Sequence, residues 1–243
     1  MTVFLTSSPS GPLDNSRYVD GLDDKNRFVE ELRCRWPEYA SCLYITAEPE
    51  GFSHNDWICQ SMAGTFRHRG LSIAAFDVWD DRSGEVSAEM LNEYQVLILG
   101  GGHVPTQNRF FQRIALREKI ASFKGLVIGI SAGTMNSADI VYAQPELEGE
   151  SYDPSYERFL TGLALTSINI LPHYQMVKDF YLDGRRLFED ITYSDSYGHE
   201  FLALTDGSYV LLEQGSTRLC GEAYRISNGE IEKICEENQI IEL

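Results

Sequence analysis

Short apolar segments alternate along this chain with segments of helical periodicity, and several of them end in small residues. Two such segments, Val96–Leu99 and Gly125–Ile130, lead directly into Gly100-Gly101-Gly102 and Ser131. Short uninterrupted apolar runs are typical of parallel strands that are buried on both faces, and helices connect such strands. The alternation therefore predicts an α/β fold with a mostly parallel sheet and helices on both faces.

The remaining elements are predicted from the same two periodicities. Further strands are expected over 3–6, 41–46, 71–78 and 168–172, and helices over 26–36, 56–69, 87–94, 106–122 and 132–138. We expect Asp56 and Ser87 to cap the second and third of these helices. A loop rich in Ser, Pro and Gly is expected over 7–12.

The last part of the chain changes character. Short strands are expected over 201–204, 209–213, 218–220, 223–227 and 230–235. Asp206-Gly207 and Asn228-Gly229 between them are two-residue hairpin signals. An antiparallel β annex is therefore predicted over about 200–243. Because no boundary signal separates the halves, we expect one domain over residues 1–243.

Composition excludes several classes of function. The 243 residues carry a formal net charge of −17, and such a field repels phosphate backbones and anionic lipid. No apolar run is long enough to span a bilayer, and Met1–Thr6 lacks the basic region of a signal peptide. Five cysteines without C-x-x-C spacing indicate free thiols in a reducing compartment. We expect a cytoplasmic protein with no nucleic-acid or membrane partner.

Gly129-Ile130-Ser131-Ala132-Gly133 fits the pattern G-x-S-x-G between an expected strand and an expected helix. A strand that passes directly into a helix must turn sharply at the serine. Such a turn strains the serine backbone and requires small neighbours, which Gly129 and Gly133 provide. The hydroxyl then projects at a helix N-terminus, where the N–H of Ala132 can stabilise an oxyanion. Ser131 is therefore a candidate nucleophile; an ordinary strand-to-helix turn of small residues is the alternative.

The glycine triplet ends a neighbouring strand, and ligands of open α/β sheets bind at the carboxyl ends of strands. The amides of Gly101 and Gly102 are therefore candidates for a second oxyanion donor. A flexible turn and a phosphate cradle are the alternatives, although the spacing matches neither G-x-G-x-x-G nor a P-loop.

A serine nucleophile needs a base, and the base needs an orienting acid. His173 lies just past an expected strand and is the candidate base, with His103 in reserve. Asp206 follows the strand expected over 201–204. An aspartate in a hairpin turn at a strand end can point into the same crevice, so the turn and the acid are compatible interpretations.

Together these residues resemble the aspartyl dipeptidase / cyanophycinase family of serine peptidases, whose fold is like that of class I glutamine amidotransferases. The resemblance runs from the first strand to the hairpin near Leu212. It rests on the glycine triplet, the turn Gly129–Gly133 (the nucleophile elbow), Leu171-Pro172-His173-Tyr174 and Leu204-Thr205-Asp206-Gly207-Ser208. It implies a flavodoxin-like three-layer sandwich and a triad of Ser131, His173 and Asp206. It also implies oxyanion amides near Gly102 and Ala132, and neither cofactor nor metal.

The chain departs from the family pattern at three places. The acid is usually Glu in the family, so Glu146 stays a competitor of Asp206. His103-Val104-Pro105-Thr106 replaces an Asn-Thr pair, which makes His103 a candidate substrate contact. No arginine clearly matches the family's carboxylate-binding arginine, and the candidates are Arg109, Arg185 and Arg186.

These observations predict a serine peptidase-like, dipeptidase E-like hydrolase of small peptides or amides, with Asp-containing peptides as one candidate class. Ser131 in place of the amidotransferase cysteine argues against glutamine amide transfer. One alternative is a non-catalytic or differently specific amidotransferase-like binding protein, and another is an esterase or amidase acting on a different small molecule. The sequence is also compatible with a homodimer.

Overall fold

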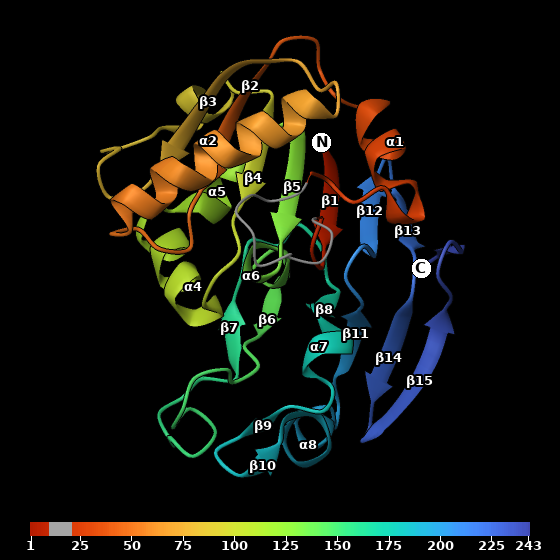
Figure 1. Ribbon diagram of the computed structural model, residues 1–243. Helices are drawn as coiled ribbons and strands as arrows, with labels where there is room; N and C mark the ends of the chain where they lie inside the picture. The colour runs from red at the N-terminus through yellow and green to blue at the C-terminus, as the bar shows by residue number, and fades with distance from the viewer. Residues whose placement is uncertain (10–20) are drawn as a thin grey trace.

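A computed structural model of the chain describes residues 1–9 and 21–243 (Figure 1). Its main sheet has eight strands in the order β16-β13-β12-β1-β5-β4-β2-β3. The five parallel strands are β1 (Thr2–Thr6), β5 (Leu126–Ile130), β4 (Val96–Leu99), β2 (Ala40–Ile45) and β3 (Ile73–Trp79). Beyond β1 the sheet continues antiparallel with β12 (Tyr209–Glu213), β13 (Ser216–Cys220) and β16 (Ile240–Glu242).

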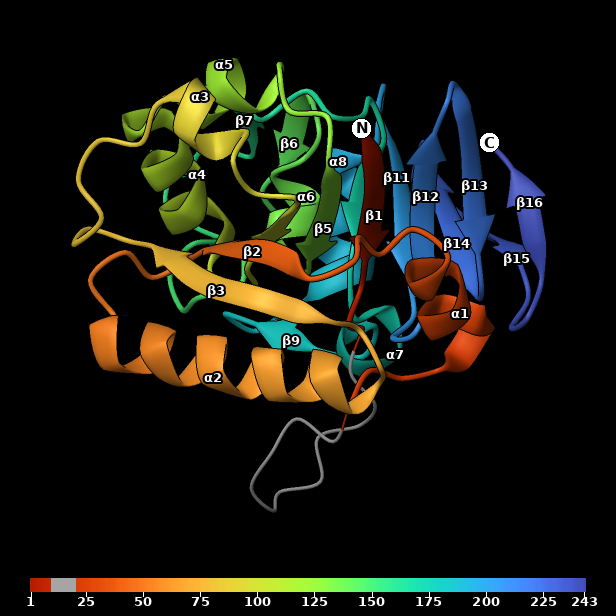
Figure 2. The same ribbon diagram turned by 90° about the horizontal axis from the view of Figure 1, so that it is seen from above.

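Helices cover both faces of this sheet (Figure 2). One face carries α1 (Phe28–Arg33), which follows η1 (Lys25–Arg27), and α2 (Phe52–His68); the other carries α3 (Ala88–Leu91), α4 (Val104–Arg113) and α5 (Leu116–Ile120). Strand β4 shows why two cores form. Its Val96 and Ile98 join the core beneath α1 and α2, whereas Leu97 and Leu99 join the core beneath α3 to α5.

A second, four-stranded sheet has the order β15-β14-β11-β8. Its strands are β8 (Asn169–Leu171), β11 (Glu200–Leu204), β14 (Ala223–Ser227) and β15 (Glu230–Cys235). Two small ribbons pair β6 (Ile140–Tyr142) with β7 (Phe159–Thr161), and β9 (Tyr181–Leu182) with β10 (Arg185–Arg186). The short helices are α6 (Ala132–Met135), α7 (Tyr174–Val177), the π-helix η2 (Leu187–Thr192) and α8 (Tyr193–Asp195).

The predicted C-terminal annex is therefore divided between two sheets. Strands β12, β13 and β16 complete the main sheet, and β11, β14 and β15 belong to the second. The hairpin predicted at Asn228-Gly229 is confirmed, because Ser227 pairs with Glu230 across it. The hairpin predicted at Asp206-Gly207 is wrong: β11 pairs with β8 and β14, so this turn connects strands of different sheets.

The predicted helices have different bounds in the structure, and two of the differences have a clear physical cause. The helix expected over 106–122 is broken into α4 and α5 at Ala115, which has a left-handed backbone with φ 49°. Lys119 Nζ donates to the carbonyl of Ile114 at 2.6 Å and so satisfies one group at the break. The helix expected to begin at Asp56 begins at Phe52, so Asp56 is not its cap.

The predicted cap at Ser87 is confirmed, since its Oγ accepts from the N–H of Met90 at 3.2 Å. The helix expected over 132–138 ends at Met135, after which two tight turns lead to β6. The last part of the loop expected over 7–12 lies outside the described residues. Within residues 1–9 and 21–243, no helix combines the length and the apolar character needed to cross a membrane.

Two glycine-to-alanine substitutions test how tightly the elbow is packed. A Cβ on Gly133 would lie 2.2 Å from the carbonyl oxygen of Leu99, whereas a Cβ on Gly64 of α2 has no heavy atom within 4 Å. We expect Gly133→Ala to lower the free energy of unfolding by about 1–3 kcal/mol, because β4 must shift. Gly64→Ala should raise it by roughly 0.5–1 kcal/mol, because alanine restricts the unfolded chain at a helical position. Urea denaturation measures both; an equal effect of the two substitutions would contradict this packing.

Candidate active site

Ser131 lies where β5 turns into α6, with φ 50° and ψ −111°. Residues other than glycine rarely adopt this backbone conformation, so the neighbours of Ser131 must hold its backbone in place. Its N–H is 3.2 Å from the carbonyl oxygens of both Thr6 and Ser7, at the end of β1. A Cβ on Gly129 would lie 3.0 Å from the Cα of Thr134, so the turn requires a glycine there. Ser131 therefore lies, half-buried, in a tight turn between a strand and a helix.

His173 reaches Ser131 from a distant part of the chain. It follows β8 and has a left-handed backbone, with φ 59° and ψ 25°, at the start of α7. Its Nε2 is 2.9 Å from Ser131 Oγ, and its Nδ1 is 2.7 Å from Asp206 Oδ1. The structure therefore brings together the three residues predicted as nucleophile, base and acid, in hydrogen-bonding order.

Asp206 lies in the turn between β11 and β12, and its carboxylate accepts three hydrogen bonds. Besides His173, Ser7 Oγ donates to Oδ1 at 2.7 Å and Gln175 Nε2 donates to Oδ2 at 2.6 Å. Burial by itself would raise the pKa of Asp206. The hydrogen bond and charge of His173, with the bonds from Ser7 and Gln175, nevertheless hold this pKa below its usual value. Asp206 is therefore kept as a carboxylate facing the imidazole.

Glu146, the competing acid, is held elsewhere. Its Oε1 accepts from the N–H of Val104 at 3.2 Å and lies 4.0 Å from His103 Nε2. Burial raises the pKa of Glu146, while the Val104 bond opposes that change. No hydrogen bond joins it to His173 among the described residues. In this geometry Asp206, not Glu146, contacts His173.

The glycine loop packs against Ser131. A Cβ on Gly101 would lie 3.4 Å from Ser131 Cβ, so this residue adjoins the serine. Gly102 has φ +149° and comes so close to Ala47 that a Cβ would lie 2.6 Å from the alanine Cβ. The triplet therefore lets the backbone pass between the elbow and the loop after β2. The N–H of Ala132, in the first turn of α6, has no partner within that helix.

The candidate substrate contacts are engaged in local interactions. His103 lies 2.8 Å from both Thr106 Oγ1 and Glu150 Oε1, and Arg109 donates to Thr106 at 3.1 Å. Arg185 donates to the carbonyl of Asp190 and Arg186 binds its carboxylate, each at 2.6 Å. Both lie on β10 in the small ribbon at the lower edge of Figure 1. None of these four side chains has a hydrogen bond to the three clustered residues within the described ranges.

Two residues at the cluster were missed at the sequence level. Ser7 is completely buried and also accepts from the N–H of His173 at 2.7 Å. The Oε1 of Gln175 accepts from the N–H of Asp206 at 3.0 Å. The position of Ser7 just after a predicted parallel strand was a usable signal, because such strand ends line the crevice. Gln175 had no signal beyond being two residues from His173.

A cavity of about 810 Å³ opens beside His173 and Asp206. Its lining includes His173, Asp206 and Gln175, together with charged side chains such as Lys178 and Glu222. The His173–Asp206 pair can therefore be reached from this cavity. Among residues 1–9 and 21–243, no cluster of three or more His, Cys, Asp and Glu side chains is arranged to hold a metal ion.

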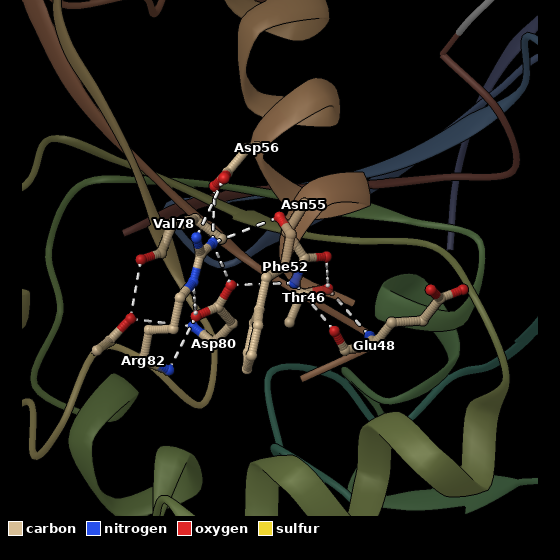
Figure 3. A network of polar contacts seen from close by, with 9 residues as sticks. Thr46, Glu48, Phe52, Asn55, Asp56, Val78, Asp80 and Arg82 are labelled. Carbon is tan, nitrogen blue, oxygen red and sulfur yellow. Dashed lines mark hydrogen bonds and ion pairs between the residues drawn. The ribbon is translucent and has the colours of Figure 1, made fainter. Parts of the chain in front are cut away.

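A polar network lies at the ends of β2 and β3, beside the loop that carries Ala47 (Figure 3). The buried Asp80 carboxylate accepts from Arg82 Nη2 at 2.7 Å and from Asn55 Nδ2 at 3.1 Å. Asn55 also accepts from Thr46 Oγ1 at 2.7 Å, and Arg82 forms a second ion pair with Asp56 at 2.7 Å. The network joins the ends of β2 and β3 to the first turns of α2. It therefore fixes the loop that carries Ala47, against which Gly102 packs.

Comparisons with known proteins agree with this architecture. Residues 37–220 match the model of Peptidase family S51. The crystal structure of a peptidase from an acI-B1 Actinobacterium aligns with a TM-score of 0.62 at 13% identity, covering 100% of this chain and 96% of that one. A candidate peptidase E from Listeria monocytogenes EGD-e aligns with a TM-score of 0.55 at 15% identity, covering 96% and 98%. No curated protein matches the chain. The predicted α/β fold with antiparallel C-terminal strands is confirmed.

The network around Arg82 has a testable pH dependence. Burial by itself would raise the pKa of Asp80, but its hydrogen bonds to Arg82 and Asn55 hold that pKa below its usual value. Such a carboxylate stabilises the fold above its unfolded pKa of about 3.9, and this contribution is lost as the pH falls through the lower folded pKa. We expect Arg82→Ala to destabilise the protein most at pH 7, and progressively less below about pH 4 as Asp80 becomes protonated.

Urea denaturation across this pH range measures the difference between Arg82→Ala and wild type. Arg225→Ala is the matched control, because Arg225 pairs with Glu232 on an exposed surface and should have little effect at any pH. A loss of stability in Arg82→Ala that does not change with pH would contradict the assigned role of the ion pairs.

Proposed function

The chain belongs to peptidase family S51, the dipeptidase E / cyanophycinase family of serine peptidases, and from this premise we propose that it hydrolyses small peptides through Ser131, His173 and Asp206. Asp-containing peptides are the first substrates to test. The observation that carries the proposal is the continuous chain of contacts from Ser131 Oγ through both ring nitrogens of His173 to Asp206 Oδ1. This is the arrangement by which a base activates a serine and an acid orients the base.

In the proposed reaction, Ser131 Oγ attacks the peptide carbonyl while His173 Nε2 takes the hydroxyl proton. The Asp206 carboxylate accepts a hydrogen bond from the Nδ1–H of His173. This bond selects the tautomer whose Nε2 carries no proton and can act as the base. His173 then gives the proton to the leaving amine, and an acyl-enzyme remains on Ser131. Water, activated by the same imidazole, releases the acid and restores the serine.

We assign the developing oxyanion to backbone amides. The N–H of Ala132 follows the nucleophile at the first turn of α6, and the glycine loop supplies the second donor near Gly101 and Gly102. Support for the loop comes from the close approach of Gly101 to Ser131. Donors that are fixed before the reaction stabilise the charge without reorganising, which is their catalytic advantage.

Replacing the nucleophile tests the proposal directly. We expect a fluorophosphonate probe to label the wild-type protein and to leave Ser131→Ala unlabelled, because the Ser131 hydroxyl lies 2.9 Å from the Nε2 of His173, whose Nδ1 is bound to Asp206. In a dipeptide library that includes Asp-X dipeptides, Ser131→Ala should lower kcat by a factor on the order of 10⁴ to 10⁶. Ser216→Ala, on β13, is the control. Equal labelling of wild type and Ser131→Ala would reject Ser131, and an inert wild type would favour a binding protein of the same fold.

A second substitution separates the two candidate acids. Asp206→Asn should reduce kcat by about 10³- to 10⁴-fold, because the amide cannot hold the required imidazole tautomer. Glu146→Gln should stay within about threefold of wild type, since Glu146 binds the N–H of Val104 and not the base. Steady-state kinetics on the same dipeptide decides between them. The reverse order of effects would transfer the orienting role to Glu146.

A further inference from the structure

Ser7 contacts all three residues of the proposed triad. Its hydroxyl donates to Asp206 Oδ1 and accepts from the N–H of His173, both at 2.7 Å. Its carbonyl oxygen is one of the two that face the N–H of Ser131, at 3.2 Å. Its own N–H donates to the carbonyl of Ser208 at 3.2 Å, in the turn that carries Asp206. The completely buried side chain of Ser7 therefore joins the base and acid segments, and its backbone carbonyl adds the nucleophile segment.

The direction of these bonds follows from donor and acceptor counting. A serine hydroxyl has one hydrogen to donate and can accept through its lone pairs. The backbone N–H of His173 can only donate, so Ser7 Oγ must accept there. Its single hydrogen is then directed to the Asp206 carboxylate, which can only accept. Because Ser7 is buried, no other arrangement satisfies all three groups.

The backbone of His173 needs this support. Its φ of 59° lies in the left-handed region, which residues with a Cβ seldom occupy. On its carbonyl side, the first turn of α7 holds it, through the N–H groups of Met176 at 2.8 Å and Val177 at 3.1 Å. On its amide side, Ser7 holds it. The orientation of the imidazole ring depends on this backbone conformation, so a change in the His173 backbone would move Nε2 away from Ser131.

We propose that Ser7 is a positioning residue that fixes the Asp206 carboxylate and the His173 backbone in one geometry; this inference rests on the proposed triad. Ser7 touches neither the substrate nor the reacting atoms, so it acts through the acid and the base. Its loss should lower the rate of the chemical step and leave substrate binding nearly unchanged. The loss should also disappear once the acid it positions has been removed.

A double-mutant cycle in the full chain tests this. With a p-nitrophenyl ester, whose activated leaving group keeps residual rates measurable, we expect Ser7→Ala to lower kcat by about 10- to 100-fold, with KM within about twofold. In an Asp206→Ala background, Ser7→Ala should change kcat by less than about threefold, because residues that act as a unit are not additive. Ser208→Ala, which removes a buried hydroxyl from the same turn, should stay within about twofold of wild type.

If Ser7→Ala lowers kcat by the same factor in the wild-type and Asp206→Ala backgrounds, Ser7 has only a structural role and the proposal is rejected. A wild-type kcat for Ser7→Ala would also overturn the proposal. If Ser7→Ala melts below the assay temperature, Ser7→Cys replaces it in the same cycle. Its thiol keeps the size of the side chain but is a weak donor and acceptor, so an intermediate rate is expected and an unchanged rate contradicts the proposal. Ser131→Ala is run in parallel. Activity in that variant rejects the triad itself, whereas its inactivity beside a fully active Ser7→Ala rejects only the role of Ser7.

Discussion

The pairing of β1 with its two neighbours is the interaction on which the site depends. In the register of the main sheet, Thr6 lies opposite Ile130 of parallel β5 and opposite Tyr209 of antiparallel β12. The residue after Ile130 is the elbow serine, and the turn just before Tyr209 carries Asp206. Ser7 extends β1 between them. A slip of one residue in either pairing would turn side chains to the opposite face and separate these groups.

Strained backbone positions gather at this edge of the sheet. Ser131 and His173 have φ values of 50° and 59°, and Gly102 has φ +149°. Such conformations persist only where the surroundings hold them firmly. Here Thr6 and Ser7, at the carboxyl end of β1, hold Ser131 and His173 by hydrogen bonds, and Ala47 packs closely against Gly102. The network of Asp80, Arg82 and Asn55 in turn fixes the loop that carries Ala47 (Figure 3). Rigid support of this kind is what preorganised chemistry requires.

The sequence-based predictions were accurate where neighbouring residues in the chain determine the structure, and they failed where contacts between more distant residues determine it. The strand before Ser131, the small residues around it and the Asn228-Gly229 hairpin depend on neighbours in the chain, and each was found. The break at Ala115 was missed because neither Gly nor Pro marks it, and Lys119 satisfies the carbonyl of Ile114 instead. The start of α2 was missed because buried bonds of Asn55, and not a local cap, hold its first turn.

The sequence by itself determined the α/β class, the strand-to-helix turn at Ser131 and the candidacy of Ser131, His173 and Asp206, because periodicity, turn chemistry and short motifs are local properties. Only the tertiary structure decided which carboxylate faces His173, that Asp206-Gly207 connects two sheets, and that Ser7 lies among all three residues of the proposed triad. Ser7 and Asp206 are 199 positions apart, and their contact exists only once β1, β5 and β12 have paired. Hydrogen-bond partners across such separations depend on strand order and register, which no local pattern encodes.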